Sequence, residues 1–138
     1  MKTATPINCA QSLKDFQTSL EELNDLMSLY HSNALDQKVL RKIIRSFEVT
    51  HELAIKTISE YFKGHGRKPF SGSREATVEA FNENLIDDGA AWLDMIICRI
   101  KINPLYPGDH DATLVKHIDL KYMSLFEVFA IRMAAALD

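Results

Sequence analysis

Glu48 and His51 have the Glu-x-x-His spacing that di-iron centres in helical bundles draw from one helix. Such a centre needs the same motif from a second helix. The residue three positions before His117 is Leu114, so the second half of the motif is missing. The sequence therefore predicts no metal site, and no cofactor is expected.

A charged row is the next feature that could act on a ligand or partner. Glu48, Glu52 and Lys56 recur at four-residue steps, which places them on one side of a helix. An apolar row runs beside them and consists of Ile43, Phe47, Ala54, Ile58 and Tyr61. The charged row is either a solvated face, where a Glu–Lys pair contributes about 0.3–0.5 kcal/mol, or a docking surface that steers a partner.

A basic loop offers a third candidate. Arg67 and Lys68 lie in the glycine-rich segment 64–72, and Arg74 follows close behind. Basic side chains near a helix N-terminus can bind phosphate. Loops of this composition are ordinarily solvated and exposed, and the sequence favours that interpretation.

Helices must position all of these residues, because no stretch shows the two-residue alternation of a strand. The first helix is expected from about Ala10 to Tyr30, after a loose arm at residues 1–9 that contains Pro6. The second should follow Asp36 as its N-cap and end near Lys63, where Gly64 and Gly66 stop it. The charged row is therefore expected within one helix that has a predicted start and a predicted end.

Three further helices are expected. Ser73 should cap a short one from Arg74 to about Asn84, with Val78 and Phe81 among its apolar positions. Asp87 and Asp88 should begin the next, which must end near Lys101 or Ile102 because Pro104 disfavours a helical residue before it. After a loop at 103–110, Asp109 or Asp111 should cap a last helix that reaches about Ala136. The predicted fold is all-α, one domain over 1–138: an antiparallel four-helix up-and-down bundle with one short extra helix.

Composition agrees with an ordinary globular chain. The 138 residues are 46% hydrophobic and 25% charged, and the net charge of −3 gives no reason to expect nucleic acid. Cys9 and Cys98 are far apart and are expected to be reduced thiols in a cytoplasmic protein. No apolar run reaches the roughly 18 residues of a membrane span, and the first residues lack a signal-peptide core, so no membrane association is expected.

Two fragments carry a family resemblance. They are RSFEVTHELAIKTISEYF at 45–62 and SREATVEAFNENLIDDGAAWLDMIICR at 73–99, in which the run LIDDG followed by WLDM is the most specific part. The chain resembles the nucleotidyltransferase substrate-binding family, a branch of the HEPN helical-bundle superfamily. The resemblance implies a small cytoplasmic four-helix bundle, usually a homodimer, that pairs with a separate minimal nucleotidyltransferase. Several such pairs act as toxin and antitoxin.

The chain departs from the family at a catalytic position. HEPN ribonucleases carry an arginine, then four to six intervening residues, then a histidine, and the two side chains supply a cation and a proton acceptor for RNA cleavage. Here Arg99 is followed by Pro104 where the first of those histidines would stand, and the next histidine along the chain is His110. Tyr106 remains, at a position that partner enzymes modify with AMP in some members. Ribonuclease activity is therefore not the favoured prediction.

The leading hypothesis is a non-catalytic subunit that binds a minimal nucleotidyltransferase, with nucleotide or RNA as candidate ligands. Its dimer would bury apolar faces of the fourth and fifth helices. Two alternatives stay open: a ribonuclease toxin that uses Arg99 with another histidine, and a purely structural homodimer. The candidate partner- or substrate-binding residues are Arg45, Glu48, Glu52, Lys56, Asp87, Asp88, Trp92, Asp94, Arg99 and Tyr106.

Overall fold

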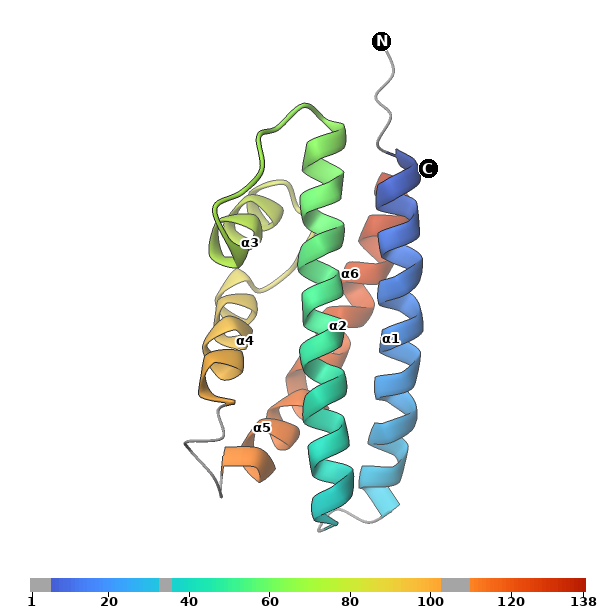
Figure 1. The fold of residues 1–138 in the computed structure, drawn as a ribbon, viewed down its shortest axis with the longest axis vertical. Helices are drawn as coiled ribbons and strands as arrows, with labels where there is room; N and C mark the ends of the chain where they lie inside the picture. Colours follow the sequence, from blue (N-terminus) through green and yellow to red (C-terminus); the bar gives the residue numbers. More distant parts are fainter. Residues whose placement is uncertain (1–5, 33–35, 103–109) are drawn as a thin grey trace.

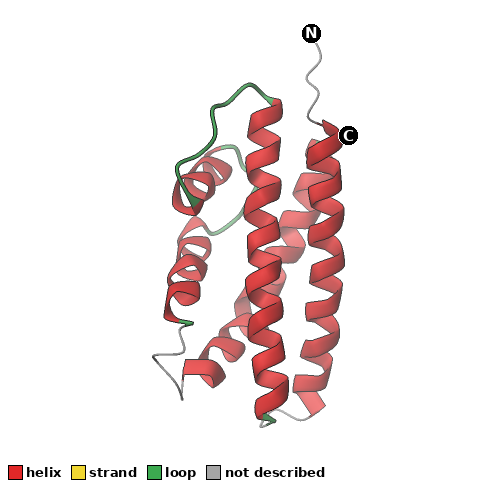
Figure 2. Cartoon of the chain, viewed as in Figure 1, coloured by secondary structure: helices red, strands yellow, loops and turns green. Residues whose placement is uncertain are grey.

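The computed structural model describes residues 6–32, 36–102 and 110–138, and the expected proline-rich loop with Tyr106 lies outside them. Every regular element in these ranges is helical, which confirms the all-α class (Figure 2). The elements are α1 (Pro6–Ser32), α2 (Gln37–Gly64), α3 (Ser73–Asn82), α4 (Gly89–Lys101), α5 (His110–His117), the π-helix η1 (Ile118–Tyr122) and α6 (Met123–Ala136). None of these helices is both long enough and apolar enough to cross a bilayer.

Two long helices form the frame of the molecule. Figure 1 shows α1 and α2 side by side and antiparallel, with the short helices α3 and α4 stacked end to end along the other side of α2. The last three helical segments follow one another without a break and pass obliquely behind α2. As a result, α2 has neighbours on several sides, and its side chains can meet residues from distant parts of the sequence.

The ends of α2 follow the prediction. The Asp36 carboxylate accepts hydrogen bonds from the backbone N–H groups of Lys38 and Val39, which the first turn leaves without helical partners. At the other end the helix stops at Gly64, and Gly66 takes a positive φ of 83°. Glycine adopts that conformation without steric cost, so the chain can turn away there.

The first helix begins earlier than the expected Ala10. It starts at Pro6, and proline is well tolerated at the first helical position because its fixed φ suits the helix. Cys9 lies within this added turn, is 1% exposed, and its thiol donates to the carbonyl oxygen of Thr57 at 3.6 Å. Residues 6–9 are therefore helical, with Cys9 packed on α2, and the prediction of an arm through residue 9 was wrong for them.

The third helix differs most from expectation. Ser73 is its first residue, not its cap: Gly72 holds the cap position without a side-chain bond, and the carboxylate of Glu75 accepts from the backbone of Ser71 instead. Val78 and Phe81 are 40% and 51% exposed. The buried positions are Ala76, Thr77 and Ala80, whose small side chains let α3 lie close to its neighbours.

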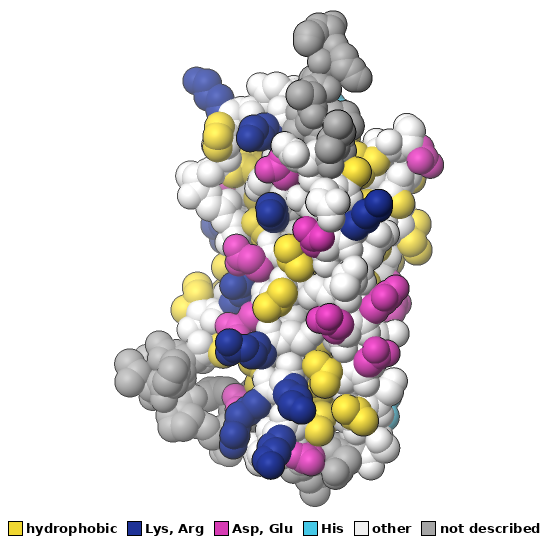
Figure 3. Space-filling model, turned by 45° about the vertical axis from the view of Figure 1, so that its right-hand side comes forward, with side chains coloured by type: hydrophobic (Ala, Val, Ile, Leu, Met, Phe, Trp, Pro, Cys, Tyr) yellow, Lys and Arg dark blue, Asp and Glu magenta, His cyan; other side chains and the backbone are white. Residues whose placement is uncertain are grey.

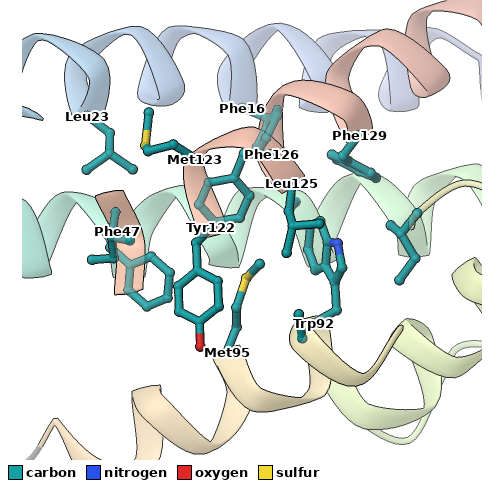
Figure 4. Close-up of a cluster of buried hydrophobic side chains, with 14 of the residues drawn as sticks. Phe16, Leu23, Phe47, Trp92, Met95, Tyr122, Met123, Leu125, Phe126 and Phe129 are labelled. Atoms are coloured by element: carbon teal, nitrogen blue, oxygen red, sulfur yellow. The ribbon is translucent and has the colours of Figure 1, made fainter. Parts of the chain in front are cut away.

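A cluster of aromatic rings fills the centre (Figure 4). Phe16 of α1 meets Phe126 and Phe129 of α6 edge to face, with ring centroids 5.8 and 5.1 Å apart. Trp92 of α4 packs against the same two rings at 5.6 and 5.5 Å and is fully buried. Edge-to-face pairs of this kind favour one fixed arrangement of α1, α4 and α6.

The final helix is interrupted, which the sequence pattern did not predict. The backbone N–H of Met123 bonds the carbonyl of Ile118, five residues back, as in a π-helix. Ile118 and Tyr122 remain buried on either side of the wide turn, while Leu120 is 74% exposed. At its start, Asp111 lies inside the first turn of α5 and so is not the cap, and Asp109 is outside the described residues. The expected end near Ala136 is confirmed.

Candidate functional site

Arg99, in the last turn of α4, reaches across to two consecutive residues of α2. Its Nη1 lies 3.1 Å from Nδ1 of His51 and 2.9 Å from Oε1 of Glu52. The Arg99 side chain is 28% exposed and that of Glu52 68% exposed, so the ion pair lies at the surface, while the histidine contact is deeper. The guanidinium is thus held by the buried ring of His51 and by the exposed carboxylate of Glu52.

His51 is 1% exposed and uncharged at neutral pH. Burial, and to a smaller extent the positive charge of Arg99, lower its pKa from 6.5 to about 3. Because a guanidinium only donates hydrogen bonds, Nδ1 must be the acceptor, and the ring proton therefore resides on Nε2. That Nε2 is buried and has no hydrogen-bond partner among the described residues.

The position of His51 follows from the apolar row of α2. It lies four residues after Phe47 and three before Ala54, so it points inward with them. Its ring centroid is 6.3 Å from that of Phe47 and 6.1 Å from that of Trp92. In the sequence, His51 stands out only as half of a metal motif. Its place on the buried face was the signal that it packs in the core.

Around Arg99 the surface is hollowed into what we call the Arg99 groove, about 390 Å³ in volume and lined by Arg45, Glu48, Val49, Glu52, Leu53 and Arg99. Val49 is 50% exposed at this surface. A second hollow of about 270 Å³ shares Glu48 and Arg99 with the groove and extends to Ser73 of α3. Figure 3 shows one face of the molecule, on which basic and acidic side chains are intermingled. Charge of neither sign dominates that face.

Four of the predicted site residues therefore meet in one place: Arg45, Glu48, Glu52 and Arg99. Lys56 is exposed on α2 but does not line the groove. Trp92 is part of the core and cannot contact a ligand at the surface. Tyr106 lies outside the described residues.

The predicted acidic residues have separate positions. Asp87 pairs with Arg132 of α6, and Asp88 caps α4 by accepting from the backbone N–H of Ala91 at 3.1 Å. Asp94 lies on the opposite side of α4 from Arg99, in another cleft. The predicted set is thus divided between the groove, the ends of helices and a second surface.

Among the described residues, the groove does not offer the histidine that the HEPN motif pairs with its arginine. Arg99 can supply a cation, but the ring nitrogen of His51 that faces it is already occupied, and the other is buried. A general base must reach the proton that it removes. His51 therefore positions Arg99, and neither of its ring nitrogens is free to accept a proton from a substrate.

The basic loop is held by internal contacts. Arg67 pairs with Glu79 at 3.1 Å and lies over the rings of Phe62 and Phe70, with its guanidinium carbon 5.4 and 5.5 Å from their centroids. Through these contacts Arg67 links α2, which carries Phe62, to α3, which carries Glu79. Within residues 6–32, 36–102 and 110–138, no group of three or more histidine, cysteine or acidic side chains could hold a metal ion.

Comparison with known families gives one match. The model of the family described as "Nucleotidyltransferase substrate binding protein like" matches residues 11–135, which include every element that forms the groove. A comparison with curated proteins finds no match.

Proposed function

Because the chain belongs to the nucleotidyltransferase substrate binding protein like family, we propose that it is the non-catalytic binding subunit of a separate minimal nucleotidyltransferase. In this proposal the protein is a cytoplasmic homodimer with a HEPN-like four-helix up-and-down arrangement, in which α3 is the extra helix. The nucleotidyl transfer itself is done by the partner. The observation that supports a docking role most directly is the fixed position of Arg99.

Arg99 has the properties of an interface anchor. Arginine is enriched in protein interfaces, where its planar group can bond several acceptors at once. Here His51 and Glu52 already hold the side chain, so less conformational entropy is lost when a partner binds it. Exposed Val49 adds an apolar contact beside it. The mixed charges of Arg45 and Glu48 provide complementarity for one partner over others.

The test is capture of the nucleotidyltransferase from native lysate with the tagged chain, with its identity and amount read by mass spectrometry. Val49→Asp places a charge in the groove and should abolish recovery of that enzyme. Leu29→Asp is the matched control, because Leu29 is 52% exposed on α1 and lies outside the groove. Near-equal recovery with the wild type and Leu29→Asp, and none with Val49→Asp, is the expected result. If no nucleotidyltransferase is recovered with the wild type, the proposal fails.

The ribonuclease alternative makes a different prediction for expression in cells. We expect expression of the chain alone to leave growth unchanged, because Pro104 stands in place of the motif histidine and Nδ1 of His51 is already bonded to Arg99. Growth arrest that Arg99→Ala relieves would instead support a ribonuclease acting in a toxin–antitoxin module. RNA cleavage by the purified chain, compared with the same variant, would then decide the matter.

A further inference from the structure

A second cleft lies on the other side of α4 from the Arg99 groove. We call it the Lys101 cleft, and its lining residues are Asp94, Ile97, Cys98, Lys101, His117, Leu120, Lys121 and Tyr122. Its volume is about 450 Å³, within the roughly 300–1,000 Å³ of small-molecule sites. A smaller hollow of about 120 Å³ continues from it and shares Cys98, Lys101 and His117.

The charge of this cleft differs from that of the whole chain. Lys101 comes from α4, and His117 and Lys121 come from the facing α5 and η1, so basic groups approach from both walls. Asp94 is the acidic residue among the lining side chains. Neither lysine ammonium forms an ion pair within the part of the chain that the structure describes. The two lysines are therefore available to an anion, although the chain carries a net charge of −3.

The cleft also has apolar walls. Ile97 on α4 is 50% exposed, and Leu120 on η1 is 74% exposed. Exposed aliphatic side chains on both walls of a cleft can cover the two faces of a flat ring, which gains by leaving water. One cavity thus offers both basic side chains for an anion and apolar side chains for a ring.

The π turn accounts for the shape of the wall formed by η1. The bond from Met123 N–H to the carbonyl of Ile118 widens the helix by one residue, so Leu120 and Lys121 face the cleft while Tyr122 stays 3% exposed. Figure 4 shows the Tyr122 hydroxyl directed toward α4. There it lies 3.5 Å from Sγ of Cys98 and forms a polar floor. Single π turns are frequent at functional sites.

We propose that the Lys101 cleft binds a nucleotide, with its phosphate on Lys101, Lys121 and His117 and its base between Ile97 and Leu120. This assignment rests on the proposed function for its biological meaning, since the nucleotide would be the substrate class presented to the partner enzyme. Binding itself is a property of the isolated chain. A failure of nucleotide binding can therefore be told apart from a failure of partner capture.

The test is calorimetric titration of the full purified chain with AMP, adenosine and inorganic phosphate. We expect saturable binding of AMP, and at least about tenfold weaker binding of adenosine or of phosphate alone, because each lacks half of the contacts. Equal binding of phosphate and AMP would reduce the cleft to a simple anion site and overturn the assignment. Absence of saturable AMP binding would overturn it as well. A single-stranded RNA that binds far more tightly than AMP would replace a small-molecule site with an RNA surface.

Variants locate the site. Lys121→Gln and Leu120→Ser should each weaken AMP binding by about tenfold, since one removes a phosphate contact and the other a wall for the base. Lys116→Gln is the matched control, because Lys116 is exposed on α5 but does not line the cleft. Amide NMR shifts caused by AMP should gather in residues 97–101 and 117–122. Binding that survives both cleft variants unchanged would contradict the proposal.

Discussion

Nη1 of Arg99 lies 3.1 Å from Nδ1 of His51, and this hydrogen bond joins the last turn of α4 to the middle of α2. It fixes three things together: the proton of His51 resides on Nε2, the ring stays neutral, and the guanidinium stays at the edge of the Arg99 groove.

Acid should destabilise the protein partly through His51. Its pKa is about 3 when folded and 6.5 when unfolded, so below pH 6.5 the unfolded chain binds the extra proton. Stability from this group is fully present above pH 6.5 and is lost as pH falls toward 3, at a slope of up to about 1.4 kcal/mol per pH unit. His51→Gln should reduce that slope in urea unfolding measured between pH 7.5 and 4.5. His65→Gln, at an exposed position, should retain it.

Removing Arg99 should cost more than removing Glu52. Arg99→Met leaves the buried Nδ1 of His51 without a donor, which costs about 1–3 kcal/mol. Glu52→Gln affects a surface pair that is worth at most about 1 kcal/mol. Arg99→Met should also raise the pKa of His51, because the nearby positive charge is gone. Denaturant unfolding and an NMR titration of His51 measure the two effects; equal costs for both variants would contradict this account.

The start of α4 should depend on the Asp88 side chain. Asp88 has a φ of 50°, and its carboxylate accepts from the N–H of Ala91. Asp88→Ala loses this cap, at about 0.5–2 kcal/mol, and adds strain because alanine tolerates that backbone poorly. Asp88→Asn keeps an acceptor and tolerates the same conformation, so it should remain within about 0.5 kcal/mol of the wild type. Thermal unfolding of the two variants distinguishes the cap from a requirement for charge.

The aromatic centre should depend on Trp92. The ring is fully buried and contacts Phe126 and Phe129, so Trp92→Ala should cost about 3–5 kcal/mol in denaturant unfolding. Ile131→Ala, on α6 at 70% exposure, should change stability by less than about 0.5 kcal/mol. A small effect at Trp92 would show that the surrounding helices collapse into the space.

Predictions from sequence succeeded where short-range interactions decide the structure. The cap at Asp36 and the stop at Gly64 depend on contacts within a few residues, and both were predicted. The prediction for the third helix was wrong because longer-range packing decides which of its residues are buried. Its pattern made Val78 and Phe81 apolar positions, but the fit against neighbouring helices favoured the small residues Ala76 and Ala80.

The sequence by itself determined the all-α class, the extent of α2 and the charged residues that the groove uses, because helical periodicity and caps are local properties. Only the tertiary structure decided which of those residues meet. Arg99 and His51 are 48 positions apart, and their contact depends on how α4 packs against α2. The Lys101 cleft likewise needs the π turn in η1 and the facing surface of α4, neither of which any local pattern specifies.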